Sequence, residues 1–326
     1  MHDSADFIAG AYELGPGPWA LTPVTRGALG QIWRLTGPDG PAWAAKQLLF
    51  DCDEEDVARE AALRLAGERL GIAAPRLFAN RHGARLTRVP TADGVTAVKL
   101  YDWIEGTRAD VADPALLDWF GRTMGLLHRA GAGATEAPNE WYERCPRDGD
   151  WKDLHGKVTE AGLPWEDALG RFIGTSAVEL ARWVSPSDAA DRVISHLDLQ
   201  PQNVLVGPAG PVLLDWDNAG PTSAERELAQ ALFVWSGGNH GDPAAARRLV
   251  HAYRQAGGPA TVRGPESFSM LFATALNYIR VQAEAAVDAE LTAAQRAFAN
   301  GEVVARLADV PDLAAVLRLV AAVTDE

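Results

Sequence analysis

The stretch Ile194–Gly220, ISHLDLQPQNVLVGPAGPVLLDWDNAG, places polar and charged side chains directly beside short apolar runs. These side chains are His196, Asp198, Asn203 and Asp215. Charged groups are rarely buried unless they bind or pair with something of opposite charge. Either these residues are ordinary loop polars, or they hold a charged ligand.

The apolar runs VLV and PVLLD flank GPAG, a pattern typical of two strands joined by a turn. Such a hairpin brings Asp215 back beside Asn203. A carboxylate and a carboxamide oxygen that converge in this way suit a hard divalent cation such as Mg²⁺. Asp198 is not needed as a ligand and is placed to accept a proton from an alcohol. The stretch therefore predicts the arrangement that phosphoryl transfer requires.

The composition is that of an ordinary globular protein, with 326 residues, 47% hydrophobic and 23% charged, enough for two lobes. The net charge of −14 argues against a nucleic-acid binder, since no basic stripe is available to neutralise phosphates. Residues 1–103 carry 11 basic and 13 acidic side chains, and the remainder carries 19 and 31. An acidic second lobe attracts cationic ligands, although acidic surface also simply keeps a protein soluble.

Cysteine content and hydropathy predict a cytoplasmic protein without a membrane partner. Cys52 and Cys145 form no disulfide framework and match no metal-binding spacing. The N-terminal MHDSADFIAG is acidic and has no apolar signal core, and no window approaches 18 uninterrupted apolar residues. The sequence gives no signal for the oligomeric state.

The first part of the chain predicts an antiparallel sheet with one helix. Gly residues and turn signals separate five strand-like runs, at 19–27, 29–37, 42–50, 84–89 and 95–103. The segment DEEDVAREAALRLAGERLG, residues 53–71, has acids in its first turn and a Gly at its end, as a helix does.

From residue 104 onward helices dominate. The segment 113–131 opens with Asp-Pro, a good cap and first-turn pair. Further helices are predicted at 165–184, 223–235, 243–255, 268–287 and 311–323. We therefore expect an α+β fold, with an antiparallel-sheet N-terminal lobe over 1–103 and a mostly helical C-terminal lobe over 104–326.

The order H-x-D-x-x-x-x-N, followed by an apolar run into an Asp, resembles the catalytic core of the aminoglycoside phosphotransferase family. These are small-molecule kinases with a bilobal, protein-kinase-like fold, and the resemblance covers roughly residues 20 to 290. It implies that the lobe over 1–103 binds the nucleotide and that the lobe over 104–326 is the catalytic and substrate-binding lobe. It implies that Asp198 is the catalytic base or orients the acceptor hydroxyl. It also implies that Asn203 and Asp215 hold Mg²⁺ and that Asp217 assists the metal or the substrate. Leu197 stands where the family commonly has Gly, which tolerates backbone conformations that Leu does not.

The resemblance extends upstream to a nucleotide site. Lys46, in the third strand-like run, is implied to contact the α- and β-phosphates, with Glu60 in the predicted helix as its ion-pair partner. Glu54 and Glu55 compete for that pairing, but acids in a first helical turn already have a helix-dipole explanation. Two further groups are implied: Gly27 and Gly30 of the turn RGALGQ over the phosphates, and the backbone of Tyr101 and Trp103 against the adenine.

The acceptor site is less defined. The segment WYERCPRDGDWKDLHGKVTEAGLPWED falls where relatives insert substrate-binding helices, and it offers Asp150. Asn277 and Glu284 lie seven residues apart on one face of a predicted helix. They either line an acceptor pocket or belong to a solvated face with an Arg280–Glu284 pair.

These features imply an ATP- and Mg²⁺-dependent kinase, with GTP not excluded, that phosphorylates a hydroxyl of a small, cationic molecule such as an aminoglycoside or amino sugar. Kinases of choline, homoserine, macrolides and sugars share the fold, so a metabolic or biosynthetic kinase is the alternative, and antibiotic resistance does not follow. A catalytically silent binding module is disfavoured because no part is missing. A protein kinase is disfavoured because the helix SAERELAQALFVW follows Asp215 without a long activation segment.

Overall fold

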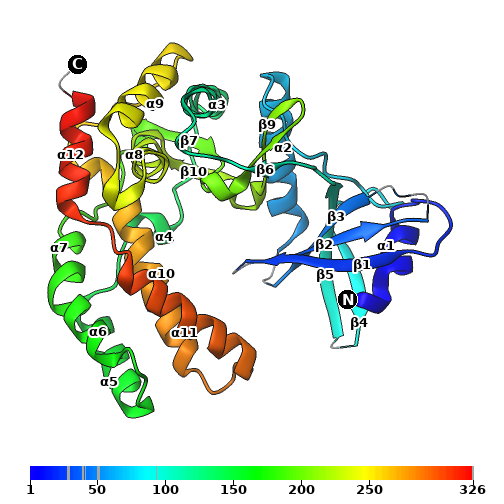
Figure 1. Ribbon diagram of the computed structural model, residues 1–326, viewed down its shortest axis with the longest axis horizontal. Coiled ribbons are helices and arrows are strands. Elements are labelled where there is room, and N and C mark those ends of the chain that lie inside the picture. Colours follow the sequence, from blue (N-terminus) through cyan, green and yellow to red (C-terminus); the bar gives the residue numbers. More distant parts are fainter. Residues whose placement is uncertain (28–29, 39, 41, 50–51, 93, 325–326) are drawn as a thin grey trace. The chain divides into compact units, whose positions relative to one another are not determined.

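The computed structural model describes residues 1–27, 30–38, 40, 42–49, 52–92 and 94–324, and its elements are shown in Figure 1. The chain forms two compact units: Met1–Ala109 with Gln202–Gly220, and Asp110–Pro201 with Pro221–Glu326. The predicted division after Trp103 stays a prediction. The segment 202–220 groups with the first unit, although the chain reaches it only after passing through the second.

A five-stranded antiparallel sheet forms the centre of the first unit, in the order β1-β2-β3-β5-β4. The five predicted runs form these strands: β1 (Ala20–Arg26), β2 (Gly30–Thr36), β3 (Ala42–Leu48), β4 (Thr87–Thr91) and β5 (Gly94–Asp102). Side chains from one face pack into a core with the short helix α1 (Ala5–Ala11), and Leu35, Val89, Val98 and Leu100 are fully buried there.

The predicted helix of this unit is α2 (Glu54–Arg69). Asp53 caps it, because its carboxylate accepts hydrogen bonds from the backbone N–H groups of Glu55 and Asp56. The buried face contains Val57, Glu60 and Leu63, which recur at helical spacing. A buried carboxylate within an otherwise apolar stripe requires a partner.

The predicted hairpin around GPAG is present as β8 (Val204–Gly207) and β9 (Gly210–Leu213). Gly207 lies opposite Gly210, whose φ of +114° suits a residue without a side chain. The short strand β6 (Thr107–Arg108) pairs with β8, and the N–H of Leu213 donates to the carbonyl of Ala73. These bonds place the end of the hairpin within the first unit.

The second unit is mostly helical. Besides the short strands β7 (Arg192–Ser195) and β10 (Gly220–Ser223), it contains α3 (Pro114–Ala130), α4 (Glu140–Glu143), α5 (Asp148–Ala161), α6 (Glu166–Phe172), α7 (Val178–Ala181), α8 (Ala224–Trp235), α9 (Pro243–Gln255), α10 (Ser269–Val287), α11 (Ala293–Ala308) and α12 (Leu313–Thr324). A π-helical turn, Ile173–Ala177, joins α6 to α7.

Helix α3 packs closely on α9. Gly121 permits this approach, because a Cβ at this position would lie 2.4 Å from the carbonyl oxygen of Leu249. Phe120 stacks on Trp235 of α8 with 4.0 Å between ring centroids. The α+β fold class is confirmed, and so are the predicted helices of this unit. Within the described ranges, no helix combines the length and the apolar character that a membrane crossing demands.

Candidate active site

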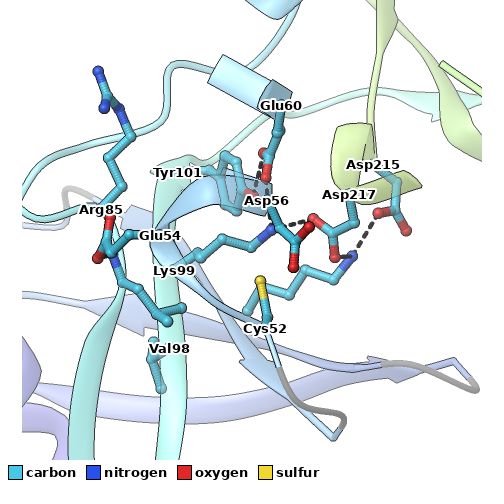
Figure 2. A network of polar contacts seen from close by, with 12 residues as sticks. Cys52, Glu54, Asp56, Glu60, Arg85, Val98, Lys99, Tyr101, Asp215 and Asp217 are labelled. Atoms are coloured by element: carbon cyan, nitrogen blue, oxygen red, sulfur yellow. Dashed lines mark hydrogen bonds and ion pairs between the residues drawn. The ribbon is translucent and has the colours of Figure 1, made fainter. Parts of the chain in front are cut away.

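Five side chains of the first unit form a continuous row of alternating charges (Figure 2). The Nζ of Lys99 lies 2.7 Å from Oε2 of Glu60 and contacts Oδ1 of Asp217. The Nζ of Lys46 lies 2.7 Å from Oδ2 of Asp217 and 2.5 Å from Oδ1 of Asp215. Asp217 therefore gives one carboxylate oxygen to each lysine.

The sheet register explains why a carboxylate is needed between the two lysines. Lys46 on β3 and Lys99 on β5 are direct cross-strand partners. Like charges opposite each other on adjacent strands destabilise a sheet. Asp217, in the single helical turn Trp216–Asn218 that follows β9, supplies the negative charge that separates them.

The row leads from the interior of the unit to its surface. The side chains of Glu60 and Lys99 are each 1% exposed, whereas that of Asp215 is 37% exposed. Three carboxylates face two ammonium groups, so the ionised row has one negative charge in excess. Its exposed end is therefore the part that is placed to meet a cation.

The ionisation of the row follows from burial and from the neighbouring charges. Burial opposes ionisation of Asp217, but the ammonium groups of Lys46 and Lys99 outweigh it and lower the pKa of this carboxyl. Burial also opposes the charged forms of both lysines, yet the carboxylates around them outweigh it and raise both pKa values. At Glu60 burial prevails over Lys99 and raises the pKa of the carboxyl.

The ion pair predicted between Lys46 and Glu60 is not the one that forms. Glu60 pairs with Lys99, and its other carboxylate oxygen accepts a hydrogen bond of 2.7 Å from the hydroxyl of Tyr101. Lys99 and Tyr101 are two residues apart on β5, so their side chains share the face on which Glu60 lies. The ammonium of Lys46 is held by Asp215 and Asp217 instead.

Asn203 and Asp215 flank the open end of the β8–β9 hairpin, as predicted. Val204 is opposite Leu213, and the N–H of Leu214 donates to the carbonyl of Asn203 at 2.8 Å. Asp215 has a φ of +58°, a left-handed conformation that Asp tolerates better than most residues.

The donor set at this end of the hairpin fits Mg²⁺. Mg²⁺ is held by one or two protein oxygens and completes its shell with water and phosphate. Asp215 and Asn203 provide a carboxylate and a carboxamide, while both oxygens of Asp217 already face ammonium groups. In the described ranges, no three or more His, Cys, Asp or Glu side chains gather as a metal cage.

The predicted phosphate-covering turn is described only at its ends, because Ala28 and Leu29 lie outside the described residues. The N–H of Gly27 donates to the carbonyl of Gly30 at 2.8 Å and closes the β1–β2 hairpin. A Cβ at position 30 would lie 3.0 Å from Cε of Lys46. Glycine at this position therefore leaves room for the side chain of Lys46.

The segment predicted to bind adenine lies at the end of β5. The backbone of Tyr101 pairs with Ala44 of β3, and Trp103 is the first residue after the strand. The indole Nε1 of Trp103 donates to Glu105 at 2.7 Å, and the guanidinium of Arg34 lies 4.7 Å from its ring centroid. The adenine contact stays a prediction.

In the second unit, the residues before the predicted catalytic Asp198 are fixed by a buried carboxylate. Leu197 has a φ of +64°, and its N–H donates to Oε1 of Glu227 at 2.7 Å. The other oxygen of Glu227 lies 2.7 Å from Nε2 of His128, whose Nδ1 is 2.8 Å from the hydroxyl of Tyr253. This network holds the backbone turn that leads into Asp198.

Two further contacts fix this turn. The N–H of Asp198 faces Nδ1 of His196 at 3.3 Å, and the carbonyl of Leu199 accepts a hydrogen bond from the indole of Trp235. Burial opposes ionisation of Glu227, but hydrogen bonds, including those of His128 and the Leu197 N–H, outweigh it and lower the pKa of the carboxyl. Glu227 therefore stays ionised and keeps its bond to the turn.

The candidate acceptor residues have structural partners. The amide nitrogen of Asn277 donates to the carbonyls of Trp141 and Arg144 at 2.8 and 2.7 Å, which fastens α4. The Arg280–Glu284 pair of the alternative interpretation is present at 2.9 Å. Asp150 accepts from the N–H of Arg147 at the start of α5 and lies 3.7 Å from Arg280. Their role toward an acceptor stays a prediction.

Sequence reasoning missed two residues of this arrangement, Lys99 and Glu227. A signal for Lys99 was present, because it lies within the apolar run VTAVKLYDW and the chain has only four lysines. A lysine in a fully buried strand must be paired. Glu227 has no such signal, since it lies in a helix rich in charged residues.

Known proteins resemble this chain in sequence profile and in fold. The sequence profile of the phosphotransferase enzyme family matches residues 20–265. Among solved structures, the chain is similar to a spectinomycin phosphotransferase in complex with ADP and spectinomycin, with 13% identity, a TM-score of 0.65 and coverage of 99% and 98% of the two chains. It is also similar to an aminoglycoside phosphotransferase from Alicyclobacillus acidocaldarius (15% identity, TM-score 0.57, coverage 97% and 93%).

A third similar structure is a microcompartment-associated aminopropanol kinase, with 17% identity, a TM-score of 0.59 and coverage of 94% and 95%. A search of curated proteins found no match. At these identities the structural similarities show the fold alone. The family profile spans more than half of the sequence, including the strands, the α2 helix and the charged row described above, and so the chain belongs to the phosphotransferase enzyme family.

Proposed function

We propose that the protein is an ATP- and Mg²⁺-dependent kinase that phosphorylates a hydroxyl of a small, cationic molecule such as an aminoglycoside or amino sugar. The observation that carries the proposal is the exposed end of the charged row. There, Lys46 contacts Asp215, and Asn203 flanks the same hairpin end. An ammonium group and two oxygen ligands are the parts that a metal-bound triphosphate requires.

Each nucleotide-binding residue has a distinct task in this proposal. Bound MgATP supplies a γ-phosphoryl group whose negative charge is neutralised by the metal. Asn203 and Asp215 hold the metal, and Lys46 binds phosphate oxygens. The remaining contacts are backbone groups: Gly27 and Gly30 over the phosphates, and Tyr101 and Trp103 against the base.

Asp198 accepts the proton of the acceptor hydroxyl. The turn that carries it is fixed by Glu227 and Trp235, which supports a role that depends on exact placement. His196 and His128 orient this turn and do not touch the reacting groups.

The cationic acceptor is supported by charge. Residues 104–326 carry 31 acidic and 19 basic side chains, an excess of 12 negative charges. A field of this sign raises the local concentration of cations. The spectinomycin and aminopropanol named for two similar structures serve as starting points for an acceptor screen. A kinase of choline, homoserine, a macrolide or a sugar is the alternative.

The test is ADP release with MgATP, or GDP release with MgGTP, in the presence of aminoglycosides, amino sugars, amino alcohols, choline, homoserine and macrolides. A cationic acceptor should stimulate turnover, and Asp198→Ala should abolish it while MgATP binding persists. Stimulation only by a sugar without an amino group would move the alternative forward. Absence of MgATP binding would contradict the kinase proposal and favour a binding module.

A further inference from the structure

The charged row contains a lysine that the proposed reaction does not use. Lys99 is 1% exposed and lies on the far side of Asp217 from Lys46. Its ammonium contacts Glu60 and Asp217, and Figure 2 shows both contacts. Through Asp217, Lys99 is one carboxylate away from the lysine that is placed to bind phosphate.

We propose that Lys99 is a positioning residue of the nucleotide site, which holds Asp217 and thereby leaves the ammonium of Lys46 available to phosphate. This inference rests on the proposed function. The sequence predicted that Lys46 both pairs with Glu60 and binds phosphate. In this proposal Lys99 pairs with the carboxylate of Glu60 on α2, and Lys46 binds phosphate.

The argument follows from how Asp217 is shared. Asp217 is almost fully buried, so its carboxylate needs compensation at all times. With Lys99 present, one oxygen of Asp217 keeps a buried ammonium partner even when Lys46 turns toward a nucleotide. Without Lys99, Lys46 is the only ammonium group among the described residues that contacts Asp217. Lys46 would then be retained by Asp217 and would bind phosphate weakly.

The same geometry separates the two aspartates by function. Asp215, at the exposed end of the row, is placed to exchange Lys46 for a metal. Asp217 has one oxygen on each lysine and is the fixed anion between them. Asp217 is therefore assigned to the lysines and not to the metal.

The test compares binding of MgATP and of adenosine by isothermal titration calorimetry. Lys99→Met should weaken MgATP binding by about tenfold or more, the size of one charge-assisted hydrogen bond, and leave adenosine binding within about twofold. Asp217→Asn added to Lys99→Met should restore most of the loss, because Lys46 is then released. The matched control is Lys157→Met, an exposed lysine on α5, which should change neither affinity.

Three outcomes overturn the inference. They are equal weakening of MgATP and adenosine, unchanged MgATP binding by Lys99→Met, and no recovery in the double variant. If Lys99→Met does not fold, Asp217→Asn alone decides: it should bind MgATP at least as tightly as the wild type and keep its Mg²⁺ requirement. A raised Mg²⁺ requirement would make Asp217 a metal ligand. A wild type that binds adenosine but not MgATP would instead refute the proposed function.

Discussion

Leu197 adopts a left-handed backbone conformation immediately before the predicted catalytic Asp198. This conformation costs a residue with a side chain roughly 1–2 kcal/mol, which Gly does not incur. The buried side chain of Leu197 and the bond from its N–H to Glu227 offset that cost. The family commonly has Gly at this position. The chain therefore keeps the left-handed backbone conformation that suits Gly, although the residue is Leu197.

We expect Leu197→Gly to be less destabilising than Leu197→Ala, the reverse of the usual order. Both lose buried contacts, worth roughly 2–5 kcal/mol, but only Gly relieves the strain of about 1 kcal/mol. Urea denaturation of the two variants measures the difference. Turnover by Leu197→Gly should stay near the wild-type value, because Glu227 still holds the N–H. A glycine variant less stable than the alanine variant would refute the strain argument.

The ionisation of Asp217 makes the free energy of unfolding depend on pH. Its pKa is lower in the folded protein than its ordinary value of 3.8, so the unfolded chain binds more protons as the pH falls. The stability that its charge contributes is therefore present above about pH 4 and is lost as the pH falls through the folded-state pKa. The difference in unfolding free energy between wild type and Asp217→Asn should shrink between pH 7 and pH 3.

Urea titrations of both proteins at each pH give that difference, and Asp118→Asn serves as the control, since this carboxylate is half exposed and pairs with Arg248 on the surface. A difference that does not change with pH would show that the charge of Asp217 does not contribute to folding.

Which charged side chains pair with one another was the least predictable part of the site. The hairpin turn fixes the register of Asn203 and Asp215, so their proximity follows from local sequence. The partner of Glu60 depends on how α2 packs against the sheet. Lys46 and Lys99 are cross-strand neighbours, and nothing local to either lysine distinguishes them.

At the scale of elements, the packing of α3 on α9 depends on a glycine. A Cβ at Gly121 would lie 2.4 Å from the carbonyl of Leu249 and 2.9 Å from Cβ of Ala252. Gly121→Ala should destabilise the protein by about 1–3 kcal/mol, as overpacking of a helix contact does.

Gly156→Ala is the matched control for that change. Gly156 lies on the exposed side of α5 with no atom within 4 Å of an added Cβ. This substitution should stabilise the protein by about 0.5–1 kcal/mol, because alanine is the better helix former. Thermal unfolding of the two variants should shift in opposite directions, and a shift of the same sign would contradict the packing argument.

Sequence patterns predicted most elements but did not predict α1, α4, α5 or α11, and only the resemblance implied helices in the segment of α4 and α5. Helix α11 contains Asn300 and Gly301, which read as a break in a helical pattern. A capping box, with Thr292 and Gln295 bonded reciprocally, marks its start and was available in the sequence. Its buried positions, Ala299 and Val303, are too few to give a strong period on their own.

At the scale of the whole molecule, the net charge of −14 gives the acceptor prediction a test in solution. Long-range attraction of a cationic acceptor is screened by salt over about 8–10 Å at physiological ionic strength. We therefore expect KM for a cationic acceptor to rise several-fold between about 20 and 300 mM KCl, since added salt screens this attraction.

The KM for a neutral acceptor, measured in the same buffers, provides the comparison and should change little. Equal salt responses for charged and neutral acceptors would mean that the acidic surface serves solubility and not recognition.

The insertion of residues 110–201 between the two segments of the first unit has a consequence for synthesis on the ribosome. When the ribosome has added residue 109, Lys46 and Lys99, the cross-strand partners on β3 and β5, have both been made, whereas Asp217 has not. A sheet that forms in that interval holds two opposed positive charges without the carboxylate between them, and closure of so distant a contact is slow. The charged row is thus completed late, after Asp198 has been made.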